Sequence, residues 1–307
     1  MAEYREDIPY TVVDSNSSEA ERREYWATGA ALQATDGLEV SKYAHDMSRD
    51  YIAGNITSQA LEKNLEEYHE QQPHDDNRQR EADIVAARIA SLLEGAPFVP
   101  GPSSLMAVHK TLFDGIFPQG MGLPGRFRTV NLEKPEPVLA GHSVQYGDYR
   151  MIGTLLDYDF AMEADYRYRK PLDMDQIDHF AKFIAGIWQI HPFREGNTRT
   201  TAVYSQLYLR SMGCKVDNTP FKDNSELFRD MLVRASYTSI DLGVKQDHSF
   251  LSKFYQNVVL GAHNDLNGLD LNVHGIRDEK HDLDYRPPVN PVLPDPQGSD
   301  SHDEEER

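Results

Sequence analysis

Ten residues from His191 to Thr200 carry the side chains best suited to chemistry. The run reads His-Pro-Phe-Arg-Glu-Gly-Asn-Thr-Arg-Thr and combines an imidazole, a carboxylate and two guanidinium groups. An imidazole is the side chain whose ordinary pKa suits a general base near neutral pH. A carboxylate is a hard oxygen ligand for Mg²⁺, and an arginine can clamp a phosphate through two parallel hydrogen bonds. His191, Glu195 and Arg199 together therefore indicate phosphoryl-type transfer from a nucleotide.

The elements on either side predict how this run is held. Apolar residues recur at helical spacing over Asp175–Ile190 and again over Thr200–Met212, where Gly213 follows. The first helix should end at His191, because the residue before a proline is disfavoured in the α region. The loop then leads into a helix N-terminus, where free backbone N–H groups and the helix dipole favour an anion. Gly196 would let the backbone approach that anion closely.

A structural interpretation fits the same residue types. Glu195 follows His191 by four positions, so the two side chains can form an ordinary surface pair. Phe193 favours this interpretation too, as an anchor that holds the loop to the core. For an arbitrary run of ten residues, the types alone favour the structural interpretation.

The run from His191 to Arg199 resembles the active-site motif of Fic (fido) proteins, His-Pro-Phe-x-Asp/Glu-Gly-Asn-x-Arg. Three neighbouring segments resemble an early core helix of that family, the segment after it and a flap hairpin: Val108–Phe117, Arg126–Thr129 and Val138–Tyr146. The resemblance extends over Ile84–Leu260, most of the chain. It implies a mainly α fold, with a Fic helical core and a small β-hairpin flap over the active site.

The resemblance also implies an activity, the transfer of AMP from ATP to a Ser, Thr or Tyr hydroxyl of a target protein with Mg²⁺ as cofactor. His191 would deprotonate the hydroxyl, Glu195 would hold Mg²⁺, and Phe193 would lock the loop. The residues that would bind the α- and β-phosphates are Gly196, Asn197 and Arg199.

Further residues receive roles from the same resemblance. Val138, Val144 and Tyr146 would belong to the flap, whose open edge can add an extended target segment as a further strand. An ordinary surface hairpin is the alternative. Tyr237 resembles a residue that approaches the adenine, although core packing is the simpler explanation for it.

Two positions depart from the family pattern. Thr198 stands where many members have glycine, which would stiffen the turn or cap the helix. Ala202 occupies the place of a second arginine, one helical turn after Arg199. The family assigns that arginine to the γ-phosphate, so its absence leaves open a donor other than ATP or an altered ATP pose.

The first part of the chain predicts helices over Glu19–Thr35, Ser41–Ile52 and Ile56–Tyr68. These helices resemble the small antitoxin partner of Fic toxins, whose inhibitory helix ends in Ser/Thr-x-x-x-Glu-Gly/Asn. Here Asp36 and Gly37 end the run, and Leu32 replaces Ser or Thr. In the family the glutamate pairs with the second arginine and blocks productive ATP binding. Both partners are altered here, so this inhibitory contact, which we call the brake, would be weaker or would involve a different residue. A helical module that only packs on the core is the alternative.

The expected organisation is a lead-in at 1–18, an antitoxin-like region at 19–70, a linker at 71–80, a Fic catalytic domain at 81–265 and an acidic tail at 266–307. The tail is rich in prolines and acids, and such a segment cannot offset its own ordering entropy.

Composition excludes several classes of protein. The net charge of −19 argues against a nucleic-acid-binding surface and against anionic membranes. The chain has no run of ~18 apolar residues that could insert in a membrane, and its acidic start is unlike a signal peptide. The single cysteine, Cys214, fits a reducing, cytoplasmic compartment. No zinc motif is present.

We therefore expect a protein adenylyltransferase restrained by its own N-terminal helix. Two alternatives keep the same site: a de-AMPylating hydrolase and a transferase of another nucleotide-linked group. A third is a catalytically silent interaction module, although such a module need not retain His191, Glu195, Asn197 and Arg199 together. The target protein is the expected partner, and the sequence leaves open a homo-oligomer and delivery into another cell.

Overall fold

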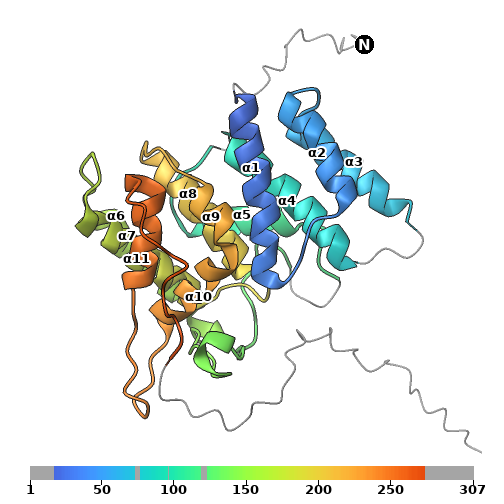
Figure 1. Ribbon diagram of the computed structural model, residues 1–307. Helices are drawn as coiled ribbons and strands as arrows, with labels where there is room; N and C mark the ends of the chain where they lie inside the picture. Colours follow the sequence, from blue (N-terminus) through green and yellow to red (C-terminus); the bar gives the residue numbers. More distant parts are fainter. Residues whose placement is uncertain (1–16, 73–76, 96, 119–122, 274–307) are drawn as a thin grey trace, which may run out of the picture. The chain divides into compact units, whose positions relative to one another are not determined.

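The computed structural model describes residues 17–72, 77–95, 97–118 and 123–273, and the fold is mainly α-helical, as predicted (Figure 1). The α-helices are α1 (Glu19–Ala31), α2 (Lys42–Ala53), α3 (Ser58–Glu70), α4 (Asn77–Gly95), α5 (Pro102–Phe113), α6 (Ile152–Asp165), α7 (Met174–Ile190), α8 (Asn197–Ser211), α9 (Thr219–Asp223), α10 (Ser225–Ser236) and α11 (Ser249–Leu260). Three short 3-10 helices are η1 (Leu32–Asp36), η2 (Pro137–Leu139) and η3 (Tyr149–Met151). The predicted lead-in, apart from residues 17–18, and the tail from 274 onward lie outside the described residues.

Local capping explains where the first three helices begin and end. The hydroxyl oxygens of Ser18, Ser41 and Thr57 accept backbone N–H groups at the starts of α1, α2 and α3. Gly37 and Gly54 adopt positive φ angles of 65° and 80° directly after η1 and α2. The predicted helix Glu19–Thr35 therefore exists, but its last turn is the 3-10 helix η1 rather than α-helix.

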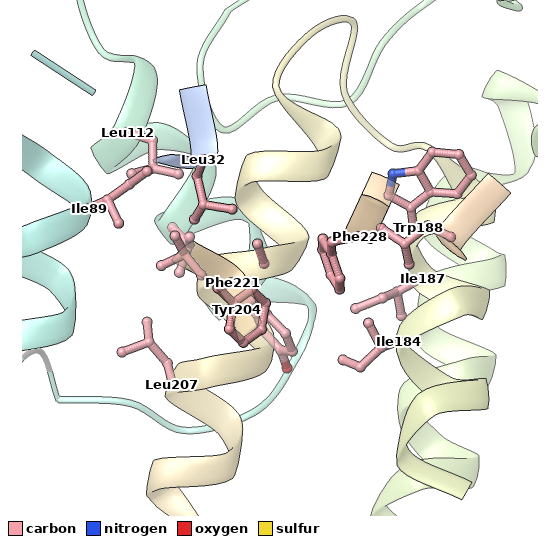
Figure 2. Packing of buried hydrophobic residues seen from close by; sticks show 14 of the residues in the cluster. Leu32, Ile89, Leu112, Ile184, Ile187, Trp188, Tyr204, Leu207, Phe221 and Phe228 are labelled. Atoms are coloured by element: carbon pink, nitrogen blue, oxygen red, sulfur yellow. The ribbon is translucent and has the colours of Figure 1, made fainter. Parts of the chain in front are cut away.

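Helix α1 packs closely against α4. At Gly29 an added Cβ would lie 2.4 Å from the backbone oxygen of Ala86, so only glycine permits this approach. Leu32, Ile89 and Leu112 belong to one continuous hydrophobic core, as Figure 2 shows. The described residues of 19–70 and 81–265 consequently share one core and lie in one compact unit. Helix α4 also begins at Asn77, which shortens the predicted linker of 71–80.

Helices α7 and α8 hold the motif between them. A capping box between Asp173 and Gln176 starts α7, which ends at Ile190 as predicted. Helix α8 begins at Asn197, three residues before the predicted start. Buried side chains of α7 and α8, Ile184, Ile187, Trp188, Tyr204 and Leu207, belong to the core in which Phe221 and Phe228 also lie (Figure 2).

The predicted β-hairpin over Val138–Tyr146 is not formed by paired strands. The described segment contains the 3-10 turn η2, closed by backbone hydrogen bonds from Glu136 to His142 and from Gly141 to Glu136. Pro135 and Pro137 lack the N–H groups that a strand ladder needs, which explains the difference. We keep the name flap for residues 133–146.

No helix in the described ranges is both long and apolar enough to cross a membrane.

We predict that Gly29→Ala lowers the free energy of unfolding by about 1–3 kcal/mol, because the new methyl group would push α1 away from the α4 backbone. Chemical denaturation measures the change. Gly95→Ala is the matched control, since an added Cβ at Gly95 meets nothing within 4 Å. Equal stabilities for the two variants would contradict this account of the α1–α4 contact.

Candidate active site

His191 is held in one orientation at the end of α7. Its φ of 52° turns the chain out of the helix, and its Nδ1 lies 3.3 Å from the carbonyl oxygen of Trp188. The Nε of Arg128 donates to the His191 carbonyl at 2.7 Å, and the Tyr146 ring stacks on the imidazole at 4.0 Å. The Nδ1 contact assigns the proton to that nitrogen and leaves Nε2 as the acceptor.

The surroundings of His191 keep its ring neutral. Burial lowers the pKa of His191 to about 3, and the nearby charges of Lys134 and Arg128 act in the same direction. At physiological pH Nε2 is therefore unprotonated, as a general base requires, but with this pKa it is a weak base in this structure.

The loop after His191 is fixed by side chains that bind its backbone. Asn197 Oδ1 accepts the Phe193 N–H at 3.0 Å, and Asn197 Nδ2 donates to the Phe193 oxygen at 2.8 Å. Phe193 is 1% exposed and stacks on His109 at 3.8 Å, which supports the anchoring role expected for it. His109 Nε2 also donates to the Glu195 backbone oxygen at 3.0 Å.

Two of these observations change the expectations. The side chain of Asn197 holds the loop rather than pointing both of its polar atoms at an anion. His109 was missed, because a single histidine in a predicted core helix gives no local signal of a contact with a loop 86 residues away in the chain.

Gly196 meets two constraints at once. Its φ is 74°, and an added Cβ would lie 2.3 Å from the ring of Phe113. Thr198, the departure from the family pattern, accepts a hydrogen bond from Trp188 Nε1 at 3.1 Å and so ties the first turn of α8 to α7.

Arg199 is 1% exposed, and each nitrogen atom of its guanidinium group contacts a polar side chain. Its Nε lies 2.8 Å from Asp36 Oδ2, and its Nη1 donates to Gln33 Oε1 at 2.9 Å. Its Nη2 donates to Glu81 Oε1 at 2.5 Å, and its guanidinium lies 4.8 Å from the centre of the Phe113 ring. Two of the three polar partners come from η1 and one from α4.

Residues 98–209, which contain this loop, match the model of the Fic/DOC family. This part of the chain belongs to the Fic/DOC family. Domains of this family are in general nucleotidyl-transfer enzymes that use ATP.

A solved structure with some likeness is the N-terminal FIC domain of Bep8 protein, a VirB-translocated Bartonella effector protein from Bartonella sp. 1-1C. It is 16% identical, the alignment covers 67% of this chain and 88% of that chain, and the TM-score is 0.41. No curated protein matches the chain.

The pKa values of two carboxyl groups in the Fic site, Glu195 and Asp36, are shifted in opposite directions. Burial raises the pKa of Glu195, and the Asp36 carboxylate raises it further. Burial alone would also raise the pKa of Asp36, but the positive charge of Arg199, with those of Lys134 and Arg229, lowers it. Asp36 therefore stays ionised beside Arg199.

The flap residues of the Fic domain lie differently from the expectation. Val138 and Val144 are 6% and 2% exposed, so their side chains belong to the core and cannot form a docking surface. The N–H of Val273 donates to the Val138 oxygen at 3.2 Å, which occupies one acceptor of the expected open edge.

Two aromatic residues remain near the flap. Tyr146 covers His191 rather than standing at an open edge. Tyr237 is 4% exposed and meets the His142 ring edge-on at 6.4 Å, as core packing predicts.

We predict that His191 does not titrate between pH 5 and 8, because its buried ring has a pKa of about 3. NMR of the imidazole carbon–hydrogen resonances measures this, with His191→Gln used to assign the signal. The sign follows from the lowered pKa: the unfolded chain takes up this proton first, so stability falls as the pH drops below about 6.5. A midpoint near 6.5 in the folded protein would contradict the burial.

Proposed function

We propose that this protein is an adenylyltransferase that moves AMP from ATP to a Ser, Thr or Tyr hydroxyl of a target protein, and that η1 restrains it. The observation that carries the proposal is the meeting of a neutral His191, the Glu195 carboxylate and Arg199 where α7 is followed by α8. Each group has a chemical type that nucleotidyl transfer needs. The reaction belongs in a reducing, ATP-containing cytoplasm, of the same or another cell.

In the proposed reaction His191 Nε2 takes the proton of the target hydroxyl. The hydroxyl oxygen forms a bond to the α-phosphorus while the bond from that phosphorus to the bridging oxygen breaks, and pyrophosphate leaves. Arg199 and the N–H groups at the start of α8 would offset the charge that develops on the phosphates. Gly196 supports this arrangement because it has no side chain that could fill the space in front of these N–H groups.

Mg²⁺ fits the residues present. Burial and the Asp36 carboxylate disfavour the ionised form of Glu195, and a cation would relieve both effects. Within the described residues no group of three or more His, Cys, Asp or Glu side chains converges as a metal site, so Glu195 would share the cation with phosphate oxygens and water. When bound, the cation would offset negative charge on the phosphates.

The restraint follows from the partners of Arg199. Its three polar contacts, to Gln33, Asp36 and Glu81, involve all three of its nitrogen atoms, and the side chain is 1% exposed, so a phosphate cannot reach it while η1 stays in place. In the family pattern the brake pairs with the second arginine, but that position is Ala202 here. We propose that Asp36 pairs with the first arginine of the motif, Arg199, so that the brake acts through a different arginine rather than being lost.

The first test uses α-labelled ATP with Mg²⁺, the full chain and a cell lysate. We predict that label is transferred to protein, and that His191→Ala lowers the rate by about 10²–10⁴-fold because the general base is lost. Chelating the metal should abolish transfer. Release of AMP from a labelled protein, without transfer, would instead favour the hydrolase. If no variant shows labelling or release, the result would favour the catalytically silent interaction module.

The second test concerns the brake. Asp36→Asn keeps the size of the side chain but removes its charge, and removing one partner of a buried ion pair costs about 3–5 kcal/mol, so we predict a rise in transfer of about tenfold or more. Asp46→Asn is the control, since Asp46 pairs with Lys42 and Arg49 on the surface of α2. Equal rates for Asp36→Asn, Asp46→Asn and the unmodified chain would remove the brake from the proposal.

A further inference from the structure

Arg229 lies beside the brake and has no role in the mechanism above. It belongs to α10, outside the residues that match the family model, and its side chain is 15% exposed. Its Nη1 donates to the backbone oxygen of Thr35 at 3.1 Å. Its Nη2 donates to both carboxylate oxygens of Glu136, at 2.8 and 2.7 Å.

The peptide of Thr35 and Asp36 therefore lies between two guanidinium groups. Arg199 from α8 contacts the Asp36 carboxylate at 2.8 Å, and Arg229 from α10 contacts the preceding carbonyl at 3.1 Å. Both arginines meet oxygen atoms of η1. Phosphate oxygens are acceptors of the same kind with more negative charge, and arginine favours them strongly.

Helix α8 itself cannot supply a second phosphate-binding cation. Ala202, one turn after Arg199, is fully buried and carries no charge. A triphosphate bound only through Arg199 would leave its terminal phosphate without a guanidinium from α8.

We propose that Arg229 supplies this missing cation and binds the terminal phosphates of ATP once η1 moves away. The inference rests on the proposed function and deepens it. The 3-10 turn η1 then excludes the nucleotide by giving Arg199 a carboxylate and Arg229 a carbonyl, the two acceptors that phosphates would replace. Arg229 differs from the family's second arginine in its origin, because it reaches the site from α10.

Glu136 orients Arg229 for this role. The carboxylate is 1% exposed and binds both of its oxygens to Nη2, which leaves Nη1 directed at the site of Thr35. A guanidinium held by one bidentate partner is pre-organised, so less freedom is lost when a phosphate binds. Glu136 is therefore a positioning residue that does not touch the nucleotide.

Lys134 of the flap is the competing cation. Its charge acts on Asp36, Glu195 and His191, so it too lies within electrostatic reach of the site. Arg229 is favoured because it already donates a hydrogen bond to the brake, at the carbonyl oxygen of Thr35, the residue before Asp36. The two cations can be separated by substitution.

The test measures binding of ATP, ADP and AMP by calorimetry to the full chain with Gln33→Ala and Asp36→Ala, which weaken the brake. We expect this protein to bind ATP more tightly than AMP. Adding Arg229→Ala should weaken ATP binding about tenfold or more and leave AMP binding unchanged, since charged hydrogen bonds to phosphate are lost. Unchanged AMP binding also shows that the variant is folded.

Two further variants separate charge from structure on the same background. Arg229→Lys should retain part of the preference for ATP over AMP. Glu136→Gln removes the ion pair but keeps Arg229 and one oxygen acceptor for its Nη2, so it should reduce that preference without abolishing it. Loss of the preference in Lys134→Ala, with Arg229→Ala unaffected, would overturn the inference. Absence of ATP binding in the background protein would overturn the proposed function itself, and this inference with it.

Discussion

A guanidinium group that is 99% buried must be paired, because an isolated charge in the interior of a protein is very unfavourable. Arg199 is such a group, and it stands on the first turn of α8, where an anion would also be favoured. In this structure its partners are Gln33, Asp36 and Glu81. Anything that removes these partners must replace them, so under the proposed function η1 and a phosphate chain would compete for the same guanidinium.

The 3-10 turn η1 reaches Arg199 because of packing elsewhere. Gly29 lets α1 lie against the α4 backbone, and Gly37 ends η1 so that Asp36 is the last residue of the turn. Gln33 is oriented at both ends of its amide: Nε2 donates to the Gly29 oxygen at 2.8 Å, and Oε1 accepts from Arg199. The antitoxin-like region is thus an integral part of the core rather than a separate module, and its position follows from close packing more than from the ion pair.

The sequence predicted the parts of this arrangement that depend on neighbours in the chain. The helix start at Ser41, the turn at Gly196 and the end of α7 at Ile190 are local features, and local patterns are sufficient for them. The partners of Arg199 were predicted only in part. Asp36 was identified by resemblance, but Glu81 and Gln33 lie 118 and 166 residues from Arg199 in the chain. No local pattern reports such a contact.

The flap shows a different limit of sequence reasoning. Alternating apolar residues suggested strands, but two prolines remove the donors that a ladder needs. The alternation also left open which side faces the core, and Val138 and Val144 proved to be the buried side. Tyr146 stacks on His191 because the segment turns inward rather than outward. Which flap side chains are buried was therefore the property of the site that the sequence predicted least well.

Negative charge is divided unevenly between η1 and the elements around it. Three of the carboxylates near Arg199 and Arg229, those of Glu81, Glu136 and Glu195, belong to α4, the flap and the loop after α7. Only Asp36 belongs to η1, and its displacement makes the site more positive by one charge where Arg199 and Arg229 lie. Displacement of η1, as proposed, would remove both the oxygen atoms that contact the two arginines and the charge that offsets theirs. It would also withdraw Leu32 from the core, so such a switch would include local repacking.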